Sequence, residues 1–160
     1  MIAPSLLIGS IIIHLAGDTD LQNKLRQDMS LLPKALEEFL RLYTPYRGFA
    51  RTANRDVEMG GRLIREDEPI ALVYSSANRD EAVFENPDEF DMDRPNLDQH
   101  IAFGMGPHQC AGAALARLML QITFEEILRR TRGWEITDKV EMTKWPEIGP
   151  LTCPMRFDPA

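Results

Sequence analysis

Cys110 lies in a glycine-rich loop, residues 103–112, with the sequence FGMGPHQCAG. A thiolate that binds a metal needs a path to the metal, stabilisation of its negative charge and protection from solvent. The loop glycines permit backbone conformations that let the chain lie against a flat bound group. The positive N-terminal end of the helix expected after the loop would face the sulfur, and Phe103 can cover it. The loop can therefore supply all three requirements of a metal-binding thiolate.

Two other interpretations of Cys110 need to be weighed. A buried, unreactive cysteine before an ordinary helix is what most single cysteines are. A zinc site is the second alternative, because His108 and Cys110 are both of types that bind zinc. Zinc needs about four ligands in a tetrahedral arrangement, and the remaining candidates are scattered along the chain: His14, His100 and Cys153. Their spacing argues against zinc.

The loop pattern F-G-x-G-x-H-x-C-x-G specifies the residue at six of ten positions, and it resembles the haem-binding signature of the cytochrome P450 family at every position. The resemblance implies that the cofactor is haem b and that Cys110 is the thiolate ligand of its iron. It further implies haem contacts for the other signature residues, Phe103, Gly104, Gly106, His108 and Gly112.

Arg51 and His108 resemble residues that bind the haem propionates in this family. Arg51 begins the segment RTANRD, which is similar to the family strand that carries a propionate-binding arginine, and His108 is similar to a histidine with the same role. A guanidinium can bind a carboxylate through two hydrogen bonds. Without the resemblance, these would be a surface arginine and a loop histidine.

Glu38 and Arg41 lie three residues apart in a predicted helix, where their side chains can meet. Such a pair is usually an exposed one of little energetic value. The pair also resembles the family's E-x-x-R element, and the segment FDMDRP at 90–95 is similar to the coil that carries its arginine partner. The resemblance implies that Glu38, Arg41 and Arg94 form a buried ion triad with a structural role.

The elements that must position these residues are predicted from periodicity and from turn residues. Pro33 suits a first helical turn and Pro45 a helix end, which places the E-x-x-R helix at 33–44. Residues 51–74 predict a small antiparallel sheet, with strand segments at 52–59, 62–64 and 70–74 around a Gly60-Gly61 turn.

The rest of the chain continues this alternation of elements. Residues 78–99 lack a helical or strand period, but apolar anchors favour ordered coil over disorder. Residues 113–132 predict the helix after the cysteine loop, with Gly133 as its cap, and residues 134–160 predict a terminal β region. The expected anchors of the coil are Phe84, Phe90 and Met92, and the expected buried face of the helix is Leu115, Leu118, Met119 and Ile122.

The N-terminal segment 1–17 is apolar, but its run from Ile2 to Leu15 is shorter than the roughly 20 residues of a spanning helix and follows no basic residue. A buried helix that needs neighbours on all sides is the better interpretation. By resemblance it is the end of the long helix on the distal side of the haem. The family's proton-relaying acid and threonine would fall near Ile2, Ala3 and Pro4, where neither type occurs.

Composition limits the class of protein. The chain has 160 residues, of which 44% are hydrophobic and 27% charged, and this is typical of one globular domain. A net charge of −7 argues against a nucleic-acid surface, and two cysteines fit a reducing compartment, so we expect a cytoplasmic protein without membrane or nucleic-acid partners. The expected fold is mainly α with small antiparallel β-sheets, the C-terminal part of the cytochrome P450 fold.

The resemblance implies a haem-thiolate monooxygenase that oxidises a small organic substrate with dioxygen. Electrons would come from NAD(P)H through a ferredoxin or flavoprotein reductase. Two alternatives remain open: a truncated, inactive fragment that self-associates, and a haem protein that uses peroxide directly, which the missing acid and threonine would suit. The resemblance covers well under half of a family member, in which the missing N-terminal portion would cover the apolar helix at 1–17 and the haem. We therefore expect this helix to lack neighbours in the isolated chain, and we expect the chain to form oligomers or aggregates, to bind haem poorly and to show no turnover.

Overall fold

The computed structural model describes residues 2–160, so the first residue of the predicted 1–17 helix, Met1, lies outside the described residues. Four of its α-helices are long enough to shape the fold, and a fifth, α4, is a single turn. The α-helices are α1 (Ile2–Gly17), α2 (Thr19–Gln27), α3 (Leu32–Leu42), α4 (Tyr74–Ala77) and α5 (Ala113–Arg130). Three short 3₁₀ segments are η1 (Met29–Leu31), η2 (Leu97–Gln99) and η3 (Gly106–His108).

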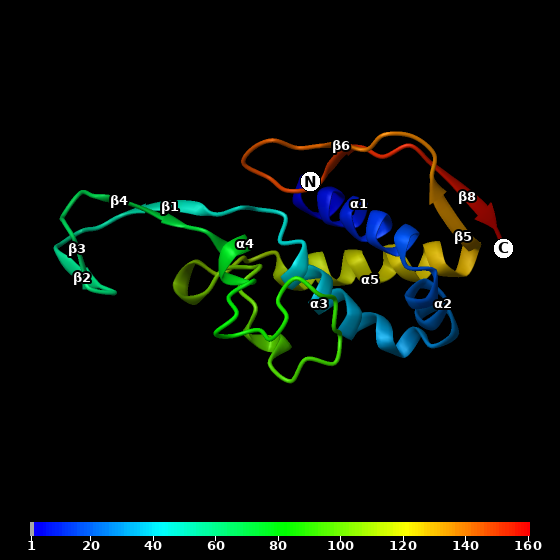
Figure 1. Cartoon of the computed structure of the whole chain (residues 1–160), viewed down its shortest axis with the longest axis horizontal. Coiled ribbons are helices and arrows are strands. Elements are labelled where there is room, and N and C mark those ends of the chain that lie inside the picture. The colour runs from blue at the N-terminus through cyan, green and yellow to red at the C-terminus, as the bar shows by residue number, and fades with distance from the viewer. Residues whose placement is uncertain (1) are drawn as a thin grey trace.

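The hydrophobic core lies where α1, α2, α3 and α5 meet (Figure 1). Each helix contributes apolar residues at three- and four-residue spacing, so that one stripe faces its neighbours. Pro33 lies in the first turn of α3, as predicted, and α3 stops at Leu42, before Pro45. Fully buried core residues include Ile11, Leu15, Leu25, Ala35, Phe39 and Phe124.

The chain itself covers most of the apolar α1 helix. The Trp134 indole Nε1 donates a hydrogen bond to the Ile12 carbonyl oxygen at 3.0 Å. A Cβ atom at Gly9 would come within 2.4 Å of Pro150 Cγ, so glycine allows the terminal β region to lie against this helix. Only the first described residue, Ile2, is strongly exposed among the large apolar side chains of α1. The expectation that α1 would lack neighbours is therefore wrong for most of its length.

The buried face of α5 differs from the prediction. Leu115, Leu118 and Ile122 are 56%, 54% and 53% exposed, and Met119 is half-buried. The face that packs against the other helices instead consists of Leu120, Phe124 and Leu128. Apolar residues recur at helical spacing on both faces, so periodicity alone does not show which face the neighbouring helices cover.

The end of α5 also differs from the prediction. The helix stops at Arg130, and Thr131 is extended, with φ −132° and ψ 148°. Gly133 is therefore not a helix cap. It lies in strand β5 (Thr131–Ile136), which begins three residues before the predicted terminal β region and pairs with β8 (Met155–Pro159). Strand pairing with the chain terminus determines this boundary, and local sequence does not reveal it.

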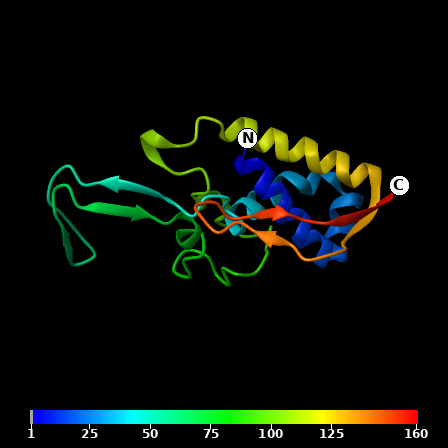
Figure 2. The same cartoon turned by 90° about the horizontal axis from the view of Figure 1, so that it is seen from above.

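Residues 49–72 form two antiparallel ladders instead of one small sheet. Strand β1 (Phe49–Thr52) pairs with β4 (Pro69–Leu72), and β2 (Val57–Met59) pairs with β3 (Arg62–Ile64) around the Gly60-Gly61 turn. Together they make an arm that extends away from the helices in both views (Figures 1 and 2). A further antiparallel ladder, in the terminal β region, pairs β6 (Glu141–Met142) with β7 (Pro150–Thr152).

Tyr74 is helical, although the sequence predicts it at the end of a strand. Its carbonyl oxygen accepts a hydrogen bond from the Asn78 N–H at 2.9 Å, which closes the single turn of α4. The buried Asn78 side chain in turn binds Thr44 Oγ1 and the Ile101 N–H, both at 2.7 Å. These contacts with distant segments determine the local conformation.

Residues 78–99 are ordered coil. Phe84 and Met92 are buried and Phe90 is half-buried, so the three predicted anchors do contact the rest of the protein. Among the helices of residues 2–160, none alone is long and apolar enough to cross a membrane; α1 and α2 meet that length and composition only as a pair bent by 107°.

Candidate functional site

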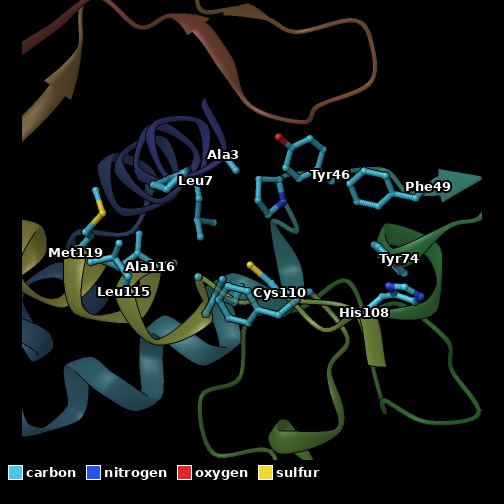
Figure 3. A pocket seen from close by; sticks show the side chains of 18 of the residues that line it. Ala3, Leu7, Tyr46, Phe49, Tyr74, His108, Cys110, Leu115, Ala116 and Met119 are labelled. Carbon is cyan, nitrogen blue, oxygen red and sulfur yellow. The ribbon is translucent and has the colours of Figure 1, made fainter. Parts of the chain in front are cut away.

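A cavity of about 470 Å³ lies between the start of α1, the start of α5, strand β1 and the cysteine loop. Figure 3 shows the Cys110 sulfur at the cavity, with apolar side chains of α1 and α5 on one side and His108 and Tyr74 on the other. Its volume lies in the range of small-molecule and cofactor sites. The lining includes Ala3, Leu7, Phe49, Arg51, Phe103, Gly104, His108, Cys110, Gly112, Leu115, Ala116 and Met119.

The cysteine loop is held by its own backbone. The Cys110 N–H donates to the Phe103 carbonyl oxygen at 2.8 Å, and the Gln109 N–H donates to the Gly106 oxygen at 3.0 Å. Gly104 and Gly106 have φ angles of 72° and 73°, where a residue with a Cβ atom is strained. Glycine is therefore needed at these two positions to shape the loop around the sulfur.

Gly112 is different from the two other loop glycines. Its φ angle of −89° is open to any residue, and an added Cβ atom would lie 3.8 Å from the Cys110 sulfur, an ordinary contact. Gly112 precedes α5, whose first residue is Ala113, so the positive end of this helix lies close to Cys110. The Cys110 side chain is exposed toward the cavity.

The two residues expected to bind propionates line the same cavity as Cys110. Arg51 and His108 are both exposed, and an Arg51 guanidinium nitrogen donates only to its neighbour's carbonyl oxygen, Ala50, at 2.9 Å. The sequence did not identify the aromatic part of the lining: Tyr46, Phe49 and Tyr74. The ring centroids of Tyr46 and Phe49 lie 5.5 Å apart, and those of Phe49 and Tyr74 lie 6.0 Å apart.

The start of α1 contributes Ala3, Pro4 and Leu7 to the cavity wall. Among the described residues that line the cavity, none is Asp, Glu, Ser or Thr. The wall near the expected acid and threonine positions is therefore apolar.

The structure brings Glu38, Arg41 and Arg94 together in the interior. Arg41 binds the Glu38 carboxylate through two nitrogens, at 2.7 and 2.8 Å, and Arg94 Nε binds it at 3.0 Å. The side chains of Glu38 and Arg41 are fully buried and that of Arg94 is 5% exposed. The arginines also donate to carbonyl oxygens of the coil, at Asn78, Pro87, Asn86 and Glu89. The triad thus ties residues 78–94 to α3.

A second charged group, which no local sequence pattern indicates, lies next to the cysteine loop. Glu37 of α3 binds Arg117 of α5 at 2.6 and 2.8 Å, and His100 Nε2 at 2.9 Å. Burial raises the pKa of Glu37, but hydrogen bonds from Arg117 and His100 outweigh it and hold this pKa at about 2. The Glu37 carboxylate in turn raises the pKa of Arg117.

The cytochrome P450 family model matches residues 12–149. This chain belongs to the cytochrome P450 family. Cytochrome P450-terp of Pseudomonas sp is 39% identical over 154 residues, which are 95% of this chain and 36% of that protein. The steroid C26-monooxygenase of Mycolicibacterium smegmatis is 40% identical over 83% of this chain and 34% of its own length. Cytochrome P450-153 from Novosphingobium aromaticivorans superposes with a TM-score of 0.90 at 38% identity, over 98% of this chain and 40% of that one.

These comparisons confirm the predicted fold class, mainly α with small antiparallel sheets and only part of the P450 fold. The P450 chain described here spans about a third of the length of the curated relatives it matches. Membership of the P450 family implies a haem cofactor.

Proposed function

We propose that Cys110 is the thiolate ligand of a haem b iron and that the chain is the haem-binding part of a P450 monooxygenase. The observation that carries the proposal is the position of the Cys110 sulfur in a mostly apolar cavity, within a loop whose glycines have positive φ angles. The substrate would be a small organic molecule that gains one oxygen atom of dioxygen while the other leaves as water. Electrons would come from NAD(P)H through a ferredoxin or flavoprotein reductase in the cytoplasm.

The residues of the cavity fit haem in their chemistry. A porphyrin has two apolar faces and two anionic propionates, so it needs an apolar slot with cations at one edge. Apolar side chains of α1 and α5 line one part of the cavity, and Arg51 and His108 also line it. The only cysteine in the lining is Cys110. A single thiolate, without further His, Cys, Asp or Glu side chains grouped for a metal among residues 2–160, suits an iron that a porphyrin would also hold.

Each of these residues then has a defined task. Bound haem would supply the oxygen-activating chemistry that protein side chains lack. Cys110 would bind the iron, and the N-terminal end of α5 would stabilise the negative charge on its sulfur. Arg51 and His108 would pair with propionates. Ala3, Pro4 and Leu7 would exclude water from the cavity.

Use of peroxide as the oxidant is a second candidate function. It is favoured by the absence of Asp, Glu, Ser and Thr from the described cavity lining, because delivery of protons to bound dioxygen normally requires such groups. In this case, haem-loaded protein would oxidise a test substrate when given hydrogen peroxide, but not when given NAD(P)H, a ferredoxin and its reductase. The opposite pattern would favour the reductase-dependent reaction.

The carbon-monoxide difference spectrum of the reduced, haem-titrated chain tests the main proposal, because it reports haem binding and thiolate ligation together. We expect a thiolate-type band from the parent chain and from Cys153→Ala, and its loss in Cys110→Ala. Cys153 is the matched control, since it is half-buried, lies outside the cavity lining and has a thiol pKa that burial raises. A thiolate-type band that persists in Cys110→Ala would refute the proposal.

A further inference from the structure

Three segments that are distant in sequence meet at the Glu37 carboxylate. Glu37 belongs to α3, Arg117 to the second turn of α5, and His100 to the coil just before the cysteine loop. Arg117 binds Glu37 through two of its nitrogens, at 2.6 and 2.8 Å. Charge-assisted, two-point pairing of this kind fixes the plane of the guanidinium as well as its distance.

The His100 ring has one proton arrangement that satisfies both of its nitrogens. The Ala102 N–H donates to Nδ1 at 3.2 Å, so Nδ1 must be the acceptor. Nε2 then carries the proton and donates it to Glu37 at 2.9 Å. With its side chain only 4% exposed, His100 thereby holds the backbone at Ala102, next to the first residue of the cysteine loop.

Arg117 also contacts the cysteine loop, through the Phe103 ring. Its guanidinium carbon lies 4.6 Å from the centre of the Phe103 ring, within the range of a cation–π contact. The carbonyl oxygen of Phe103 accepts the hydrogen bond from the Cys110 N–H, at 2.8 Å. A continuous series of contacts therefore runs from Glu37 through Arg117 and Phe103 to the backbone of Cys110.

We propose that Glu37 and Arg117 are positioning residues for the Cys110 ligand. They hold Phe103, the first residue of the cysteine loop, and through the Phe103 carbonyl they hold the Cys110 amide, so that the sulfur keeps one orientation toward the cavity. Neighbouring residues that orient a metal ligand and control solvent access to it are known to tune the metal. The effect on bound iron rests on the proposed function, whereas the effect on the loop backbone does not.

The first test uses the haem-free chain and residue-resolved hydrogen exchange. In Arg117→Gln and Glu37→Gln, the Cys110 amide should exchange about fivefold faster than in the parent, measured relative to the core amide of Ile11. Arg129→Gln is the matched control, because Arg129 lies on the same helix and makes exposed ion pairs with Glu125 and Glu126. Arg117→Lys keeps the cation and should recover part of the protection. An unchanged relative exchange rate of the Cys110 amide in both Arg117→Gln and Glu37→Gln would overturn the proposal.

The second test measures the midpoint reduction potential of the haem-titrated chain. Through-space charge alone predicts shifts of opposite sign, because Arg117→Gln removes a positive charge and Glu37→Gln a negative one. Loss of a shared positioning contact instead predicts shifts of the same sign in both variants and none in Arg129→Gln. Shifts of opposite sign in the two midpoint potentials, or no shift in either, would overturn the proposed effect of Glu37 and Arg117 on the bound iron. If the parent lacked a thiolate-type spectrum, the proposed function would fail, while the exchange test would still decide the positioning.

Discussion

Glu37 and Glu38 are consecutive residues of α3, yet their carboxylates hold two different parts of the chain. Glu38 binds Arg41 and Arg94 in the interior and ties down the coil, whereas Glu37 binds His100 and Arg117 beside the cysteine loop. Consecutive residues of a helix point in directions about 100° apart, so one turn can serve both groups.

Removal of a triad member should destabilise the protein strongly. Glu38→Ala leaves two buried guanidinium groups without their carboxylate, at a cost of about 3 to 5 kcal/mol in the free energy of unfolding. We expect a large fall in melting temperature or insoluble protein. The control is Glu126→Ala, which breaks exposed pairs with Arg129 and Arg130 and should have little effect. A normal yield and melting temperature for Glu38→Ala would show that the triad does not stabilise the fold.

Stability should depend on Glu37 in acid. The pKa of Glu37 is lowered from 4.5 to about 2 in the folded protein, so its ionised form favours folding. This contribution is fully present above pH 4.5 and is lost as the pH falls from there toward 2. Urea unfolding at about pH 6 and about pH 3 should therefore show a smaller acid-induced loss for Glu37→Gln than for the parent. Equal losses would mean that Glu37 does not have this low pKa.

Haem retention should depend on Arg51 and His108, which both line the cavity. Arg51→Ala and His108→Ala should each weaken retention about tenfold, because each would remove one propionate contact, while the thiolate-type spectrum remains. Arg55→Ala is the matched control for Arg51, since Arg55 is exposed and lies outside the cavity lining. Transfer of haem to an excess of a haem-scavenging protein measures retention. Transfer rates equal to the control would leave Arg51 and His108 without this role.

The isolated chain should self-associate through the apolar face of α5. Leu115, Leu118 and Ile122 form an exposed stripe on this helix, and water contact with it is unfavourable. We expect sedimentation velocity to show oligomers, and haem titration to show weak haem retention. Leu118→Gln with Ile122→Gln should shift the distribution toward monomer, whereas Val83→Gln, in the coil, should not. A parent chain that sediments as a monomer with stoichiometric haem would contradict this prediction.

The sequence by itself determined the family and the residues of the cysteine loop. The signature lies within ten consecutive positions, and the chemistry of a thiolate, two constrained glycines and a helix start is readable from local spacing. Pro33 and Pro45 likewise bracketed the E-x-x-R helix, because a proline restricts its own backbone and removes a hydrogen-bond donor.

Only the tertiary structure decided which surfaces meet. The buried face of α5 depended on where α1, α2 and α3 lie, and two apolar faces at helical spacing were equally readable from the sequence. Glu37 binds His100 and Arg117, which are 63 and 80 residues away in the sequence, so no local pattern predicts these contacts. Backbone preferences and signature chemistry act over a few neighbouring residues, whereas burial and ion pairing depend on the spatial arrangement of distant segments.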